Sequence, residues 1–123
     1  MPVVTIECLP PPDNARIDRV LAAVPALLGA AINCPTGDIW VYYTPVAAAR
    51  SGDTARSFTG HSPIVTVRAR AWRTEEQVRA GLVAVATAVS ESLGVPLDDV
   101  WVHWLEVPPG RVYSGSTIGE FEP

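Results

Sequence analysis

The sequence contains no lysine, because all nine of its basic residues are arginine. A protein without lysine cannot use a lysine Schiff base for catalysis. Cysteine and histidine are also scarce, with Cys8, Cys34, His61 and His103 spread along 123 residues. This spacing suits neither a metal site nor a disulfide scaffold. We therefore expect a protein that uses no metal and no other cofactor.

Positive charge and long apolar runs are lacking as well. The formal net charge is −4, and nucleic acids and anionic membranes both require a basic surface. The longest apolar stretch, residues 20–32, is too short to cross a bilayer and contains Pro25 and Gly29. No charged segment followed by an apolar run marks a signal peptide. We expect a cytoplasmic protein with no nucleic-acid or membrane partner.

An internal repeat is the most informative feature that is present. Residues 2–6 (PVVTI) match residues 63–67 (PIVTV), and residues 38–41 (DIWV) match residues 99–102 (DVWV). Both matches fall at the same offset of 61 positions. Two separate matches at one offset indicate a duplicated structural unit.

Each copy predicts a strand, a helix and a second strand. The β-branched runs 3–6 and 64–67 open the copies, and the runs 39–44 and 100–105 close them. The first helix is expected from Asp13 or Asn14 to about Asn33, with a kink at Pro25. The second is expected to begin at Thr74, whose Thr-Glu-Glu-Gln sequence is typical of a capping box, and to end near Gly94.

The predicted organisation is one α+β domain over residues 1–123. Repeat 1 covers 1–46, a linker 47–62, repeat 2 63–107, and a C-terminal hairpin or tail 108–123. Right-handed crossovers give one four-stranded mixed sheet with both helices on one face. The closing strands are apolar or aromatic on both sides, so the uncovered face predicts an oligomer.

A β-α-β repeat that starts with Met1-Pro2 and carries arginines before the second helix resembles the tautomerase superfamily. The resemblance covers nearly the whole chain. The segment 70–74 (RAWRT) followed by 99–103 (DVWVH) is most similar to the cis-3-chloroacrylic acid dehalogenase branch, with some likeness to malonate semialdehyde decarboxylase. The resemblance implies a homotrimer in which Pro2 is catalytic and Arg70 and Arg73 hold a substrate carboxylate.

The chemistry of these residues fits that implication. Removal of Met1 would turn Pro2 into a rigid secondary amine, and burial or nearby guanidinium groups would favour its neutral, basic form. A wetter site, or one with a carboxylate, would favour the protonated form as an acid, and the sequence leaves both open. Guanidinium groups bind carboxylates through two parallel hydrogen bonds. Trp72, between the arginines, is a candidate wall of the site.

The sequence departs from the dehalogenase pattern at three places. A histidine of that branch falls on Leu28 and Gly29, a tyrosine falls on His103, and the water-activating glutamate falls on Ser114, beside Tyr113. Hydrolytic dehalogenation is therefore not expected. His103 is either a proton donor or a neutral, hydrogen-bonded sheet residue.

Asp38 has two interpretations. It falls where malonate semialdehyde decarboxylase has its catalytic aspartate, yet Asp99 at the same place in the second copy favours a turn role for both. Three hypotheses follow. The leading one is a tautomerase of small 2-oxo or enol carboxylic acids. The second is a decarboxylase or hydratase of a three-carbon acid. The third is a non-catalytic, ferredoxin-like binding module.

Overall fold

The structure, a computed structural model, describes residues 2–9, 12–49, 62–114 and 117–118. Most of the expected linker, His61 and parts of the expected tail lie outside these residues. The regular elements are β1 (Val3–Cys8), α1 (Asn14–Ile32), η1 (Thr36–Asp38), β2 (Trp40–Pro45), β3 (Ile64–Arg70), α2 (Glu75–Leu93), η2 (Leu97–Asp99), β4 (Trp101–Val107), β5 (Tyr113–Ser114) and β6 (Thr117–Ile118).

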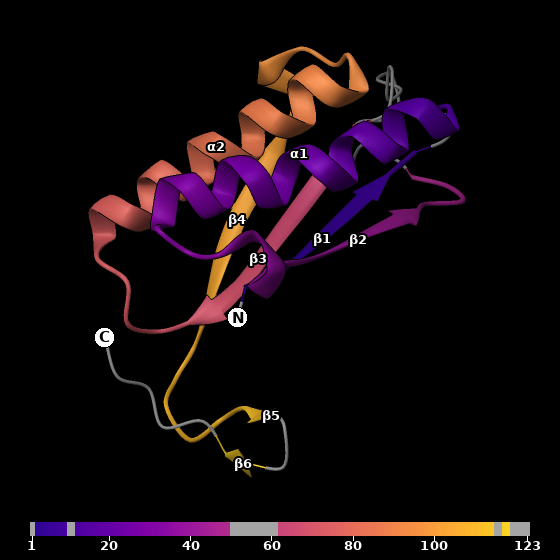
Figure 1. Cartoon of the computed structure of the whole chain (residues 1–123). Helices are drawn as coiled ribbons and strands as arrows, with labels where there is room; N and C mark the ends of the chain where they lie inside the picture. Colours follow the sequence, from indigo (N-terminus) through magenta and orange to yellow (C-terminus); the bar gives the residue numbers. More distant parts are fainter. Residues whose placement is uncertain (1, 10–11, 50–61, 115–116, 119–123) are drawn as a thin grey trace.

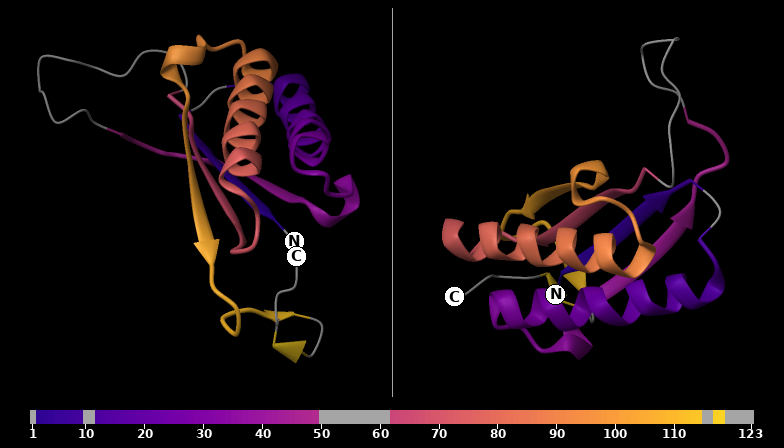
Figure 2. Two further views of the ribbon diagram at one scale, coloured as in Figure 1. Left: turned by 90° about the vertical axis from the view of Figure 1, so that its left-hand side faces the viewer. Right: turned by 90° about the horizontal axis from the view of Figure 1, so that it is seen from above.

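The strands of the two repeats form one mixed sheet in the order β2-β1-β3-β4. The pairs β1–β2 and β3–β4 are parallel, as crossover connections require, and β1 joins β3 antiparallel at the centre. Both helices cover one face of the sheet (Figures 1 and 2). The expected fold class is confirmed.

Local sequence sets the ends of both helices. The Asp13 side chain accepts a hydrogen bond from the Arg16 amide at 2.8 Å and caps α1. Thr74 and Gln77 form the expected capping box of α2. Asn33 and Gly94 close the helices in the left-handed region, with φ of 54° and 68°. Helix α1 continues through Pro25 to Ile32.

Backbone hydrogen bonds repeat between the two halves at the offset found in the sequence. The Trp40 amide donates to the Pro2 carbonyl at 3.0 Å, and the Trp101 amide donates to the Pro63 carbonyl at 3.1 Å. The short helices η1 and η2, which were not expected, occupy equivalent positions before β2 and β4. The repeat is therefore present in the structure as well as in the sequence.

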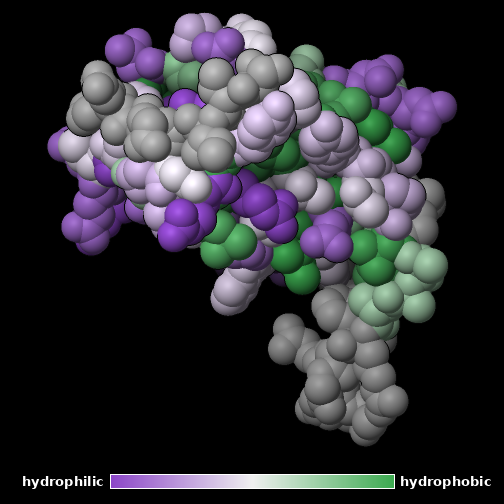
Figure 3. Space-filling view, turned by 90° about the horizontal axis from the view of Figure 1, so that it is seen from below, coloured by the Kyte–Doolittle hydropathy of each residue, from purple (hydrophilic) through white to green (hydrophobic). Residues whose placement is uncertain are grey.

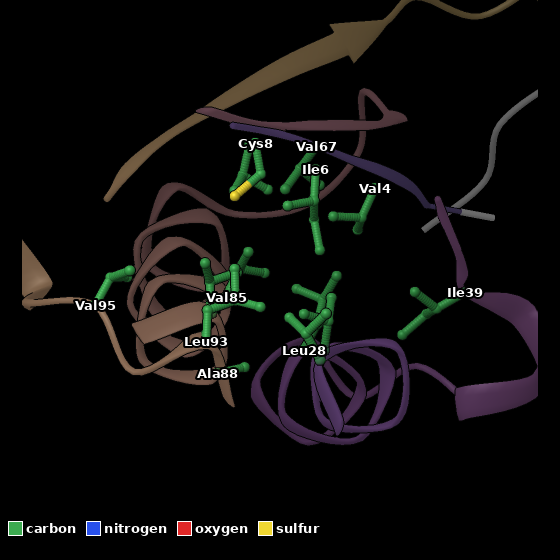
Figure 4. Packing of buried hydrophobic residues seen from close by; sticks show 14 of the residues in the cluster. Val4, Ile6, Cys8, Leu28, Ile39, Val67, Val85, Ala88, Leu93 and Val95 are labelled. Atoms are coloured by element: carbon green, nitrogen blue, oxygen red, sulfur yellow. The ribbon is translucent and has the colours of Figure 1, made fainter. Parts of the chain in front are cut away.

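The core lies between the helices and the sheet (Figure 4). Val4, Ile6, Val67, Leu28 and Val85 are fully buried in it. Removing these apolar side chains from water is the main force that holds the layers together. The layers are close enough at Gly81 that an added Cβ would lie 2.8 Å from the ring of Trp104. Glycine is the residue that permits this approach of α2 to β4.

The opposite face of the sheet is uncovered in the single chain (Figure 2). Its large side chains are about half exposed or more: Trp40, Tyr42, Ile64, Trp101 and Leu105. Seen from below, hydrophobic groups lie between hydrophilic ones on this side of the molecule (Figure 3). We call this surface the open face.

The C-terminal segment extends beyond the sheet (Figure 1). A turn at Gly110, with φ of 78°, leads to the two-stranded pair β5–β6. Among the described residues, no helix is long and apolar enough to cross a membrane.

Candidate functional site

Pro2 lies at the start of β1, where its ring is fully buried. Its carbonyl accepts the hydrogen bond from Trp40 that joins it to the beginning of β2. Val3 pairs with Arg68 in the antiparallel register, so Pro2 lies level with Ala69, the residue before Arg70. The start of β1 therefore meets the end of β3 at one edge of the sheet (Figure 1). This edge is formed by the ends of the strands and not by an outer strand.

Arg70 ends β3 at this edge, and Arg73 follows in the turn before α2. The Ala71 amide donates to the Val107 carbonyl, and the Trp72 amide donates to the Arg70 carbonyl, both at 3.0 Å. These bonds and the cap at Thr74 fix the backbone of the turn. The turn holds both arginines beside the strand that begins with Pro2.

Arg73 is the most unusual side chain of this group. Its Nε and Nη1 atoms are buried, and neither has a hydrogen-bond acceptor among the described residues. Burial lowers the pKa of Arg73, the Cys34 thiol opposes this shift, and Arg70 adds to it. The guanidinium is partly buried, although its removal from water costs free energy. It can supply two strong donors to a bound anion.

Cys34 is a neighbour of Arg73 that the sequence analysis missed. Its amide donates to the Gly29 carbonyl at 2.9 Å just after α1, and its Sγ lies 3.6 Å from the Pro35 carbonyl. The repeat held a signal, because the equivalent position in the second half is Val95, a buried apolar residue. Only the first repeat has a thiol at this position, and the Cys34 side chain is partly exposed.

Trp72 is 37% exposed and lies under the guanidinium of Arg73. Asp38 ends η1, two residues before Trp40, and so lies at the same edge of the sheet as Pro2. Its amide donates to the Pro35 carbonyl, as the Asp99 amide does to the Pro96 carbonyl. The two aspartates thus occupy equivalent turns, and the Asp38 side chain is exposed.

His103 is not part of this group. It lies on the open face in the middle of β4, paired with Thr66, and is hydrogen bonded to that residue. Tyr113 and Ser114 are exposed in β5, which pairs with β6 and not with the main sheet. The structure thus brings Pro2, Arg70, Trp72, Arg73 and Asp38 to one edge and leaves His103, Tyr113 and Ser114 elsewhere in the chain.

The first-helix histidine of the dehalogenase branch has no room here. Leu28 is fully buried in the core. A Cβ on Gly29 would lie 2.6 Å from the carbonyl oxygen of Cys34, a contact with backbone that real Cβ atoms do not make. The loop after α1 occupies the space that a side chain at position 29 would need.

No group of three or more histidine, cysteine, aspartate or glutamate side chains that could hold a metal ion occurs in the described part of the chain. Among the described residues, the charged side chains that we assign to the candidate site are Arg70, Arg73 and Asp38. The arrangement suits an organic anion and a proton-transfer group.

Solved structures share this fold closely. The structure of Pt0534 inactivated by 2-oxo-3-pentynoate has a TM-score of 0.85 at 20% identity, covering 95% of this chain and 94% of that one. A fused 4-OT protein, Q0, a symmetric trimer, has a TM-score of 0.82 at 21% identity, covering 95% and 94%. N1, a member of the cis-3-chloroacrylic acid dehalogenase family, has a TM-score of 0.77 at 20% identity, covering 95% and 82%. No family model and no curated protein matches the sequence.

These comparisons show that the chain has the fold that the tautomerase resemblance implied. The sequence resemblance favoured the dehalogenase branch, yet the fused 4-OT structure and Pt0534 superimpose with higher TM-scores than N1. At this level of identity the likeness concerns the fold, and the chemistry must be argued from the residues of this chain.

Proposed function

We propose that this protein is a cofactor-independent tautomerase of small 2-oxo or enol carboxylic acids and a member of the tautomerase superfamily. One observation carries the proposal. Arg73 presents two buried donors that have no acceptor among the described residues, at the edge of the sheet where Pro2 precedes β1. An unsatisfied buried donor costs about 1–3 kcal/mol. A carboxylate bound between Arg73 and Arg70 would remove this cost.

The bound acid would be oriented by the arginines and would react at Pro2. With Met1 removed, the Pro2 nitrogen is a secondary amine with one lone pair. In its neutral form it takes a proton from the carbon next to the carbonyl, and the resulting ammonium gives that proton to the enolate oxygen. Ketonisation of an enol runs the same two transfers in reverse, from oxygen to Pro2 and from Pro2 to carbon. The nearby guanidinium groups stabilise both the amine in its neutral form and the enolate charge.

We also propose that the protein assembles as a homotrimer through the open face. The exposed Trp40, Tyr42, Ile64, Trp101 and Leu105 give the sheet a second apolar surface that its own helices do not cover. The fused 4-OT protein Q0 forms a symmetric trimer, which supports an assembly of three copies. We place the reaction in the cytoplasm, where Cys34 stays a thiol.

Asp38 favours a second candidate function, the decarboxylation or hydration of a three-carbon acid. Its exposed carboxylate lies at the edge that carries Pro2 and Arg73. A carboxylate there would keep the Pro2 amine protonated, so that it would act as an acid. Release of carbon dioxide from malonate semialdehyde, lost in Asp38→Asn, would favour this function over tautomerisation.

The deciding experiment begins with the intact mass of the purified protein, because the amine exists only after Met1 is removed. Ketonisation of a small enol acid is then followed by absorbance for the wild type, Pro2→Ala and Arg73→Gln. We expect Pro2→Ala to lower kcat and Arg73→Gln chiefly to raise KM. Arg79→Gln is the matched control, because Arg79 is an exposed arginine that pairs with Glu75 on α2.

A folded Pro2→Ala variant with wild-type activity would sink the proposal. A retained Met1 together with no activity would instead point to the third hypothesis, a non-catalytic binding module. Incubation with 2-oxo-3-pentynoate gives an independent measurement. A single adduct mapped to Pro2 and absent in Arg73→Gln would support an amine and an arginine in one site.

A further inference from the structure

Both ring nitrogens of His103 are hydrogen bonded on the open face. The indole Nε1 of Trp101 lies 3.1 Å from His103 Nδ1, and the Thr66 hydroxyl lies 3.2 Å from His103 Nε2. An indole N–H only donates, so Nδ1 must accept and carries no proton. The ring proton is therefore on Nε2, which donates to the Thr66 hydroxyl. This arrangement fits the neutral imidazole alone.

Protonation of Nδ1 would set two donors against each other. The hydrogen bond from Trp101 would be lost, and the indole, which is 64% exposed, would lose the contact that orients it. At the same time the imidazole would become a cation. One proton would thus change both the shape and the charge of this part of the open face.

Among the described strands of the sheet, the charged side chains that share the open face with His103 come from β1 and β3. Arg68 of β3 is its diagonal neighbour on the open face, since Arg68 pairs with Leu105 while His103 pairs with Thr66. Arg70 lies further along β3, and Glu7 lies on β1, beyond β3 from β4. The helices cover the other face of the sheet (Figure 2). On the described strands, the charged side chain diagonal to His103 is therefore a cation, as a protonated His103 would be.

The occupant of the open face in this inference is a second copy of the chain, as in the proposed trimer. His103 stands in a row across the sheet with Thr66, Thr5 and Tyr42. A neutral row of this kind can be buried against another copy at little cost. A buried, unpaired imidazolium would carry a large desolvation cost.

We infer that His103 makes the assembly of this protein sensitive to pH: the neutral ring, held by Trp101 and Thr66, permits copies to associate through the open face, and its protonation separates them. The inference rests on the proposed trimer and is independent of the proposed reaction at Pro2. Histidine as a class changes charge between pH 5 and 8.

The test is sedimentation equilibrium of the full chain at pH 7.5 and pH 5.5 at constant ionic strength. We expect a trimer at pH 7.5 and a trimer dissociation constant at least about a hundredfold higher at pH 5.5, because three imidazoles take part. His103→Gln can accept from Trp101 and donate to Thr66 without titrating, so it should remain a trimer at both values. His61→Gln, at the other histidine, should respond like the wild type.

A second variant tests the hydrogen bond itself. Trp101→Phe keeps an aromatic ring but removes the N–H that opposes protonation of Nδ1, so its dissociation should begin at a higher pH than that of the wild type. Nitrogen chemical shifts of the His103 ring at pH 7.5 report the tautomer directly, and we expect the Nε2–H form.

The outcomes separate the inference from the proposed function. An equal dissociation constant at both pH values, or a His103→Gln variant that dissociates like the wild type, overturns the switch. A monomer at pH 7.5 overturns the switch together with the trimer. Tautomerase activity lost in Pro2→Ala would still stand in either case, because that assay does not measure assembly.

Discussion

The guanidinium of Arg73 lies over the indole ring of Trp72, 4.6 Å from the ring centroid. The contact couples a residue that is partly exposed to one whose Nε and Nη1 atoms are buried. A cation over an aromatic face is attracted by the negative charge on that face. The indole therefore helps to hold the guanidinium in the orientation that would bind an acid.

Replacement of Trp72 tests this coupling. A contact of this kind contributes about 0.5–2 kcal/mol, so Trp72→Ala should raise the Kd for a small carboxylate by about twofold to thirtyfold, measured by calorimetry. Trp72→Phe should lose less, because it keeps an aromatic face. The melting temperature of both variants should stay close to that of the wild type. Unchanged affinity in Trp72→Ala would show that the ring has no part in positioning Arg73.

Cys34 offers a second test of the same site, through the charge of the reagent. A thiol beside a guanidinium should attract an anionic alkylator, so iodoacetate should label Cys34 faster, relative to iodoacetamide, than it labels a free thiol. The thiolate displaces iodide, and the thiol proton passes to solvent. Arg73→Gln should abolish this preference. Cys8 is fully buried and serves as the internal control, since it should stay unlabelled in the native protein.

A small 2-oxo acid should also protect Cys34 from iodoacetate. The measurement is the mass of the labelled peptide over time, with and without the acid. Equal rates for iodoacetate in the wild type and in Arg73→Gln would contradict a functional contact between Cys34 and Arg73.

The sequence was sufficient to predict the fold, because the same strand–helix–strand pattern occurs in it twice. Thr74 and Gln77 mark the start of α2, and Asn33 and Gly94 occupy equivalent helix ends. Local signals of this kind do not depend on distant contacts. The short helices η1 and η2 were missed, because three-residue turns leave no periodic pattern.

The candidate site was less predictable, because it depends on which loops meet at one edge of the sheet. The placement of Arg73 beside Cys34 joins segments 39 residues apart, and no local pattern reports it. The burial of Arg73 Nε and Nη1 is likewise a property of packing. The hydrogen bonds of His103 were foreseen only as one of two alternatives, since the alternation of β4 gives its face but not its partners.

Tyr43 gives a prediction for stability at high pH. Burial, together with the Cys8 thiol, raises the pKa of Tyr43 to about 12, and burial also raises the pKa of Cys8. The unfolded chain therefore releases these protons at a lower pH than the folded chain does. The stability they contribute is complete below about pH 9 and is lost as the pH rises toward 12.

Tyr43→Phe should reduce this alkaline loss, measured by urea unfolding at pH 8 and pH 10.5. At pH 8 the variant should be as stable as the wild type or slightly more stable, because it removes a buried hydroxyl that has no hydrogen-bond partner of good geometry in the described part of the chain. Tyr113→Phe is the matched control, since Tyr113 is exposed in β5, outside the main sheet. An alkaline loss that is the same in Tyr43→Phe and the wild type would refute the assignment.

Gly29 and Gly37 form a matched pair that tests how tightly the loop after α1 packs. A Cβ at Gly29 would meet the Cys34 carbonyl at 2.6 Å, whereas a Cβ at Gly37 would meet nothing within 4 Å. Alanine normally favours a helix over glycine by about 1 kcal/mol, but at position 29 the backbone contact should reverse the sign. We expect Gly29→Ala to lower the free energy of unfolding by about 1–3 kcal/mol, and Gly37→Ala to change it by less than about 0.5 kcal/mol.

Because the same loop carries Cys34, Gly29→Ala should also slow the labelling of Cys34 by iodoacetate, while Gly37→Ala should leave it unchanged. A Gly29→Ala variant that is more stable than the wild type would show that the loop can move away, and the missing histidine of the dehalogenase branch would then need another explanation.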